Sequence, residues 1–165
     1  MACIALAAVV IIAGCSTSTR STGLPEHIRT VEVHIFQNKT MYQGLEGRLT
    51  RQIIDRINMD PSIRVVSRGG DAIITGEITD VKRTTVRETT TDEPATVSLS
   101  MHAIFSFYDE IGRRYLLEDV PVSSSDSSSS AGLYEAARGE STTLAEEGAS
   151  RVLAADIVRR TIGMW

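Results

Sequence analysis

The stretch that decides the fold is residues 97–107, VSLSMHAIFSF. Apolar side chains alternate along it with small or polar ones. The apolar set comprises Val97, Leu99, Met101, Ala103, Phe105 and Phe107, and the polar set comprises Ser98, Ser100, His102 and Ser106. Because successive side chains of a strand point to opposite faces, this alternation predicts a β-strand with one face in a hydrophobic core.

A second, longer strand is predicted just before it, over residues 72–86. Ile74 and Ile78 share one face of this strand, and Gly76 between them suggests close packing or a bulge. The polar stretch 84–93 then reads as the end of a hairpin that projects into solvent. These two segments are therefore expected to pair as antiparallel neighbours.

Residues 109–112 predict a tight turn, and residues 113–122 return as another strand. Residues 123–130 form a serine-rich loop interrupted by Asp126, which we expect to be mobile. Nearer the N-terminus, two shorter strands are expected. One contains Val31, Val33 and Ile35, all facing the core, and the other covers residues 63–66.

Two helices complete the predicted elements, over residues 42–58 and 142–162. The first carries an apolar row of Leu45, Leu49, Ile53 and Ile57, and the second a stripe of Leu144, Gly148, Val152, Ala155 and Ile162. The order is β-α-β-β-β-β-α. It predicts an α+β two-layer sandwich, with a mostly antiparallel or mixed sheet of about four to five strands and both helices on one face.

Length and charge limit the functions that need consideration. The chain has 165 residues, a length typical of one domain, and a net charge of −4 from 17 basic and 21 acidic side chains. Only 5% of its residues are aromatic. Clustered Lys and Arg and base-stacking aromatics are the usual marks of nucleic-acid binding, so no nucleic-acid partner is expected.

No catalytic or metal-binding pattern is found in the sequence. The histidines His27, His34 and His102 lie far apart and in no metal-ligating spacing, and the cysteines Cys3 and Cys15 both precede the predicted domain. We therefore expect no metal, no cofactor and no enzymatic activity. An envelope hydrolase, a third class of function, is not expected, because no nucleophile in the sequence can be paired with a base.

The N-terminus reads as an export signal. Residues 2–13 form an apolar run of a length that suits a signal peptide and is too short to cross a membrane. The run ends in a sequence that resembles the bacterial lipobox, in which an aliphatic and two small residues precede a cysteine: Ile12, Ala13, Gly14 and Cys15. The alternative is a buried N-terminal strand or helix that happens to end in Gly-Cys.

The lipobox divides the chain into three parts. Residues 1–14 are the expected signal peptide, residues 15–24 the lipidated cysteine and a flexible polar linker, and residues 25–165 one folded domain. The resemblance implies acyl chains such as palmitate on Cys15, because several chains are needed for stable anchoring. Ser16, rather than Asp, follows the cysteine, which by analogy predicts the outer membrane on its periplasmic side.

Three small features of the sequence are candidate binding, glycosylation or acid/base sites. Lys82, Arg83 and Arg87 form a modest basic cluster in the predicted hairpin, which is either a contact for the phosphates of an anionic glycolipid or a solvated face. Residues 38–40 fit a glycosylation sequon but are favoured in turns anyway. The adjacent carboxylates at 118–119 point to different faces of a strand, which argues against an acid/base pair.

Residues 28–40, IRTVEVHIFQNKT, resemble the opening of the lipopolysaccharide-assembly lipoprotein family, the LptE-like proteins. That family typically reads I-R-T-V-x-V-x-x-F-x-N-x-T there. The likeness continues through residues 44–46, 49–50, 64–66, 71–78 (DAIITGEI) and 154–158. It therefore spans nearly the whole of the expected domain.

The resemblance implies a role that composition does not show. Members of this family sit as a plug inside the large outer-membrane β-barrel that inserts lipopolysaccharide, the LptD-like translocon, and they assist its assembly and contact lipopolysaccharide. The expected partners are therefore that barrel, lipopolysaccharide and, through the lipid anchor, the membrane.

A runner-up reading remains open. A similar strand and amphipathic helix open other periplasm-facing lipoproteins, including penicillin-binding-protein-activator-like and curli-secretion-like ones. Such a protein would be an activator or a secretion-channel component. Its sequence would continue with further α/β repeats after the strand that begins at Ala72, whereas a long hairpin and a final helix are predicted here.

Overall fold

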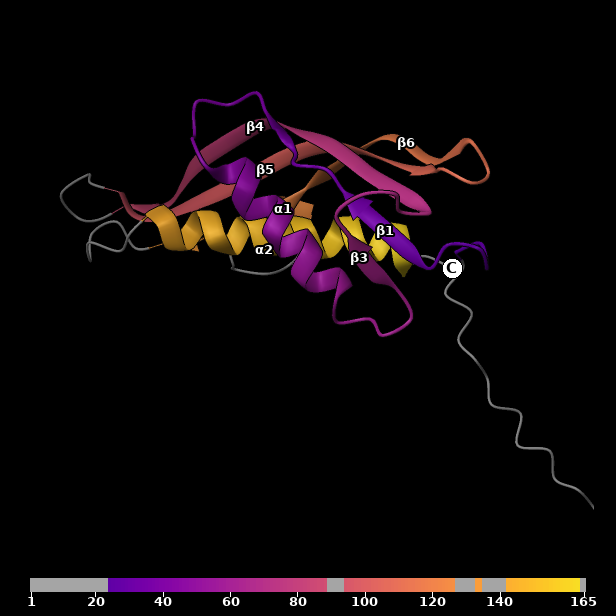
Figure 1. The fold of residues 1–165 in the computed structure, drawn as a ribbon. Coiled ribbons are helices and arrows are strands. Elements are labelled where there is room, and N and C mark those ends of the chain that lie inside the picture. The colour runs from indigo at the N-terminus through magenta and orange to yellow at the C-terminus, as the bar shows by residue number, and fades with distance from the viewer. Residues whose placement is uncertain (1–23, 89–93, 127–132, 135–141, 164–165) are drawn as a thin grey trace, which may run out of the picture.

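A computed structural model describes residues 24–88, 94–126, 133–134 and 142–163 (Figure 1). The strands are β1 (Thr30–Val33), β2 (Gln37–Asn38), β3 (Arg64–Val66), β4 (Ala72–Glu88), β5 (Pro94–Asp109), β6 (Arg114–Ser123) and β7 (Leu133–Tyr134). The helices are α1 (Leu45–Ile57) and α2 (Thr142–Ile162), with a short 3-10 turn, η1 (Ser124–Asp126), after β6. The predicted signal peptide and lipobox, with Cys15, lie outside the described residues.

The strands form one mixed sheet in the order β3-β1-β4-β5-β6. β1 runs parallel to both β3 and β4, whereas β4, β5 and β6 are antiparallel neighbours. The two-residue strands β2 and β7 pair with β4 and β5 respectively. The predicted mixed sheet is thus confirmed, and the strands that sequence patterning missed are these two very short ones.

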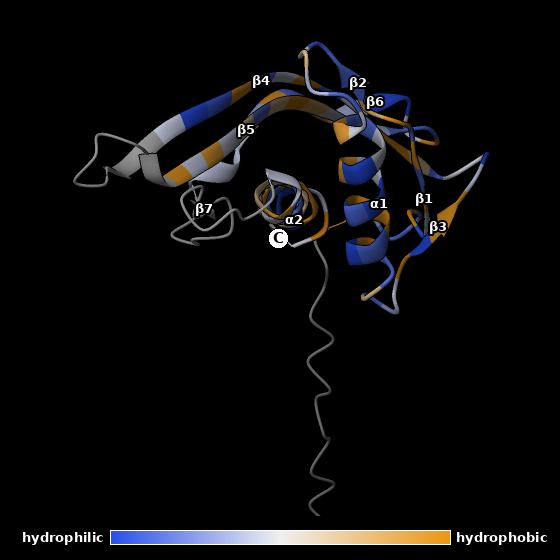
Figure 2. Cartoon of the chain, turned by 90° about the vertical axis from the view of Figure 1, so that its left-hand side faces the viewer, coloured by the Kyte–Doolittle hydropathy of each residue, from blue (hydrophilic) through white to orange (hydrophobic). Residues whose placement is uncertain are grey.

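Both helices lie on the concave side of the sheet, which curves over α2 (Figure 2). α1 contacts β1, β2 and β3, and α2 contacts β5 and β6. A pair between Arg48 on α1 and Glu146 on α2, with 3.7 Å between nitrogen and oxygen, links the helices. The predicted two-layer α+β architecture is confirmed. The convex face of the sheet carries no helix from the described part of the chain.

The core lies between the concave face and the helices. The alternation in residues 97–107 predicts it correctly, because each apolar member of that run is at most 4% exposed. The α1 row of Leu45, Leu49, Ile53 and Ile57 is fully buried, as expected from its spacing. Neither α1 nor α2 combines the length and the apolar character that crossing a membrane would require.

The expected burial of Ile35 is wrong. β1 ends at Val33, and Ile35 is 73% exposed, while Phe36 beside it is only 1% exposed. The chain leaves the sheet after Val33, so the strict alternation of a strand no longer applies. The N–H of Phe36 donates to the Thr50 hydroxyl on α1 at 3.1 Å, which holds the aromatic ring on the core side.

The predicted apolar stripe of α2 is wrong in part, although the bounds of the helix are as predicted: Gly148 and Ile162 are buried as expected, and the other three residues are not. Leu144 is 63% exposed, and Val152 and Ala155 are only partly buried. The buried face consists of Ala145, Gly148, Ala149, Ser150, Leu153, Ala154, Ile157, Thr161 and Ile162. Small residues dominate this face, because α2 packs closely against both α1 and β5.

The first residues of the serine-rich segment, 123–126, are part of the folded structure rather than of the mobile loop expected for residues 123–130. Ser123 closes β6, and Ser123 and Ser124 are buried. The Ser124 hydroxyl oxygen accepts the N–H of Met101 at 2.9 Å, which satisfies a buried donor of β5. Residues 127–130 lie outside the described residues.

Candidate functional site

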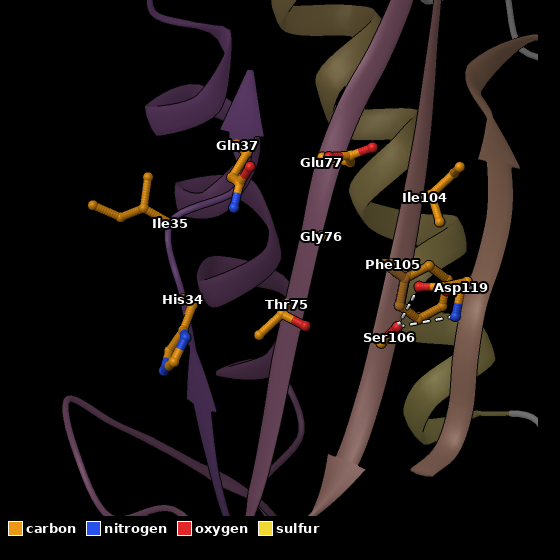
Figure 3. Close-up of a pocket in the computed structure, with 10 residues that line it drawn as sticks. All are labelled: His34, Ile35, Gln37, Thr75, Gly76, Glu77, Ile104, Phe105, Ser106 and Asp119. Atoms are coloured by element: carbon orange, nitrogen blue, oxygen red, sulfur yellow. Dashed lines mark hydrogen bonds between the residues drawn. The ribbon is translucent and has the colours of Figure 1, made fainter. Parts of the chain in front are cut away.

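A groove of about 460 Å³ crosses the convex face of the sheet (Figure 3). Its lining comes from four separate segments of the chain. The residues are His34, Ile35, Gln37, Thr75, Gly76, Glu77, Ile104, Phe105, Ser106 and Asp119. This hollow is the candidate interaction groove.

The floor of the groove is formed by the outward side chains of β4 and β5. In the register of these strands Thr75 lies opposite Ser106, and Glu77 lies opposite Ile104. Ile74 and Ile78, on either side of this segment, are fully buried on the other face, so Thr75 and Glu77 point outward. The floor of the groove is therefore a regularly paired part of the sheet.

One wall is the segment between β1 and β2. Phe36 turns inward and its ring lies against Gly76, where an added Cβ would fall 2.4 Å from the Phe36 Cε1 atom. Ile35 and Gln37 on either side are exposed. The glycine thus brings this wall close to β4, and the buried ring fixes it there.

The opposite wall is a bulge in β6. Phe105 pairs with Val120 and Phe107 with Leu117, so two residues of β6 oppose Ser106 alone. One of them, Asp119, has a φ of +48°. Its N–H donates to the Ser106 hydroxyl oxygen at 2.9 Å, and that hydroxyl donates to Asp119 Oδ1 at 3.1 Å.

The groove is lined by acidic charge. Glu77 and Asp119 contribute carboxylates, and the lining contains no Lys or Arg. His34 Nε2 lies 2.8 Å from Glu32 Oε1, and this hydrogen bond lowers the pKa of Glu32. Lys39 lies beside the groove, with its Nζ 3.9 Å from Glu77 Oε2.

The three basic residues singled out from the sequence all lie on β4, beyond the part that pairs with β1 and β2. Lys82 is exposed, with its Nζ 3.8 Å from Asp80 Oδ2. Arg83 lies opposite the buried Leu99, so its side chain starts from the concave face and that of Lys82 from the convex face. The side chain of Arg87 lies outside the described residues.

A buried carboxylate stands at the turn between β5 and β6. Asp109 is fully buried, and both its oxygens lie 2.9 Å from His27 Nε2. Burial raises the pKa of Asp109, but the N–H of Gly112 at 2.8 Å and the His27 contact outweigh it, so the pKa is lowered. No group of three or more His, Cys, Asp or Glu in the described ranges could hold a metal ion.

The two sequence motifs at residues 28–40 and 71–78 meet in space. Asp71 Oδ2 accepts the backbone N–H groups of Arg29 and Thr30 and the Thr30 hydroxyl, all within 2.9 Å. Hydrogen bonds to these groups lower the pKa of Asp71. Together with the contact between Phe36 and Gly76, they fasten the first motif to β4, so these motif residues build the fold.

The Asn-Lys-Thr sequence at 38–40 is a turn, as predicted. Asn38 Oδ1 accepts the N–H and hydroxyl of Thr40 at 2.9 and 2.7 Å, and its Nδ2 donates to Tyr42 O and to Glu46 Oε2. Bonds from the backbone N–H of Glu46 and from Asn38 lower the pKa of Glu46. The turn thus sets the start of α1, which begins at Leu45 rather than at the predicted residue 42.

Sequence reasoning missed the groove altogether. Its walls come from segments that are distant in the chain, and the bulge that places Asp119 depends on the pairing of β5 with β6. No sequence signal pointed to the groove, because the sequence predicted that Ile35 faces the core and its exposure is visible only in the structure.

The mixed sheet with two helices on its concave face is a fold that is also seen in solved structures. The hypothetical protein CT253 from Chlamydia trachomatis is similar, with a TM-score of 0.54 and 10% identity over 81% of this chain and 95% of its own. Uncharacterized lipoprotein B from Nitrosomonas europaea is similar with a TM-score of 0.51 and 9% identity, over 83% and 84% of the two chains. At such identities these likenesses concern the fold alone.

The family is shown by the sequence itself. The sequence profile of the LptE family, described as lipopolysaccharide-assembly, matches residues 28–161. The chain belongs to this lipopolysaccharide-assembly family. No protein with a curated description matches it.

Proposed function

We propose that this protein is a non-enzymatic outer-membrane lipoprotein that acts as a plug and assembly partner for the β-barrel that exports lipopolysaccharide. The observation that carries the proposal is the match of the lipopolysaccharide-assembly family over residues 28–161. The convex face of the sheet supports it, because no helix of the described residues covers that face and a plug needs a surface free to contact the wall of a barrel.

The membrane attachment in this proposal rests on the N-terminal sequence. Signal peptide removal would leave Cys15 as the first residue, with acyl chains that hold the domain at the periplasmic side of the outer membrane. Residues 16–23 then lie between Cys15 and Leu24, the first residue the structure describes, so nine Cα–Cα steps join the two. A chain of that length spans at most about 32 Å, so the domain would stay close to the membrane surface.

Contact with lipopolysaccharide is proposed for the distal part of β4. Lys82, Arg83 and Arg87 are the candidates, because guanidinium and ammonium groups bind phosphate well. Lys82 and Arg83 leave the strand on opposite faces, so they would contact different parts of a large glycolipid rather than one phosphate.

The proposal is tested by purifying the tagged, full-length protein from its native membranes in a gentle detergent. A stoichiometric outer-membrane barrel of the lipopolysaccharide-exporting type is the expected companion, identified by mass spectrometry. Recovery of a peptidoglycan synthase or a secretion channel without such a barrel would instead support the runner-up class. A tagged, unrelated outer-membrane lipoprotein from the same membranes is the control for non-specific recovery.

A further inference from the structure

We infer that the groove on the convex face binds a basic side chain, Lys or Arg, of a protein partner. The inference rests on the proposed function in one respect, because the partner is taken to be the barrel that holds this protein. It goes further by assigning the contact to a defined hollow and by stating the chemistry of the occupant.

The charge of the groove selects a cation. Glu77 and Asp119 line it, and the lining includes no Lys or Arg. Phosphate groups would meet two lining carboxylates, of which one, Glu77, is paired with Lys39, so the remaining negative charge disfavours a glycolipid headgroup there. A guanidinium or ammonium group beside either carboxylate would gain a charge-assisted hydrogen bond.

The shape of the groove fits the stem of such a side chain. Ile35 and Ile104 supply apolar surface beside the carboxylates, and the free volume is about 460 Å³. Lys and Arg bury their methylene stems against apolar surface and keep the charged end in a polar place. The groove therefore offers an apolar surface for the stem of a long basic side chain and carboxylates for its charged end.

The exposure of Ile35 marks the groove as a contact surface. Ile35 is 73% exposed, although a neighbouring side chain, Phe36, is withdrawn into the core. On the same convex face Tyr108 and Tyr115 form an edge-to-face pair with ring centroids 4.9 Å apart, and Tyr115 is 53% exposed. Tyrosines of this kind are enriched in protein interfaces, so the groove lies on a face suited to docking.

The walls of the groove are held in place before any partner binds. Phe36 is fixed by its bond to Thr50 and by its contact with Gly76. Asp119 is fixed by its two hydrogen bonds with Ser106, which is itself only 8% exposed. A pre-formed site loses little conformational entropy on binding.

The location of the contact is tested by cross-linking within the purified complex. Ile35→Cys introduces a thiol in the wall of the groove, and Met59→Cys introduces one at an equally exposed position, 73%, beyond the end of α1. Each thiol is labelled with a short photo-crosslinker, and the cross-linked peptides are sequenced by mass spectrometry. We expect the Ile35→Cys chain to cross-link to a barrel peptide that contains Lys or Arg, and the Met59→Cys chain not to do so.

The charge of the contact is tested by Glu77→Lys, with Asp55→Lys on the exposed side of α1 as the control of equal charge change. Loss of an interface charge pair predicts that Glu77→Lys weakens barrel binding by about 30-fold, whereas Asp55→Lys leaves it unchanged. If both variants have the melting temperature of the unsubstituted chain, their folding is intact.

The outcomes separate this inference from the proposed function. A barrel that co-purifies but does not cross-link at position 35, or cross-links equally at position 59, overturns the inference and leaves the proposed function standing. A cross-link to lipopolysaccharide alone also overturns it, as does unchanged binding by a folded Glu77→Lys chain. If no barrel co-purifies at all, the proposed function fails, and the inference fails with it.

Discussion

The ring of Phe36 packs directly on the backbone of Gly76. A Cβ at position 76 would lie 2.4 Å from the Phe36 Cε1 atom and 2.7 Å from the carbonyl oxygen of Ile104. Because the second neighbour is backbone, a side chain at this position cannot be accommodated by a simple rotation. The contact therefore fixes the segment after β1 on β4 and, with it, one wall of the groove.

Gly76→Ala is expected to lower the free energy of unfolding by about 1–3 kcal/mol, since the added methyl forces a shift of ring and backbone. Chemical denaturation monitored by circular dichroism measures this. Gly47→Ala is the control, because nothing lies within 4 Å of a Cβ at that exposed helical position. That change should stabilise the chain by up to about 1 kcal/mol, so equal effects of the two substitutions would contradict the packing described.

The orientation of α2 is tested by two leucines. Leu153 is fully buried and Leu144 is 63% exposed. Leu153→Ala should cost about 2–5 kcal/mol of stability, because it leaves a cavity in the core. Leu144→Ala should change stability by no more than about 0.5 kcal/mol. Thermal and urea unfolding measure both losses of stability. A larger loss for Leu144→Ala than for Leu153→Ala would show that the orientation of α2 is wrong.

Acid is expected to weaken the fold. The pKa values of Asp71, Asp109 and Glu46 are lowered in the folded chain. A group with a lowered folded pKa stabilises the protein above its unfolded pKa, and this contribution is lost as the pH falls through the folded value. Stability should therefore fall once the pH drops below the ordinary value of 3.8 for the aspartates.

Denaturant titrations at pH 6, 4 and 2.5 measure this dependence. Asp71→Asn removes one of the titrating groups, so its stability should change less with pH than that of the parent chain. Asp55→Asn, which removes an exposed carboxylate on α1, is the reference for the loss of one charge. A steeper acid dependence in the Asp71→Asn chain would show that Asp71 is not held ionised by Thr30 and Arg29.

Lipid attachment is predicted to depend on a single sulfur atom. Cys15→Ser should abolish incorporation of labelled palmitate and release the protein from the outer-membrane fraction, because the proposed acyl chains need a thiol for their linkage. Cys3→Ser, which lies inside the expected signal peptide, is the control and should leave labelling intact. Labelling that persists in the Cys15→Ser chain would move the anchor elsewhere.

Periodicity is enough to predict elements that have one clear apolar face. The row in α1 and the alternation in β5 are of this kind, since their large side chains can be buried on one side alone. α2 lacks that clarity, because small and apolar residues surround much of the helix. Its buried face is determined by close packing against α1 and β5. The sequence of the helix alone does not show which residues make these contacts.

The sequence by itself determined the order of the elements, the two-layer class, the core of β5 and the family motif at residues 28–40. The elements and their core follow from local alternation, helical spacing and turn chemistry, which act over a few residues, whereas the motif is a resemblance to the family. Only the tertiary structure decided the inward turn of Phe36 and the position of Asp119. Both depend on neighbours that the sheet brings from afar, and the groove between them exists because strands distant in the chain pair side by side.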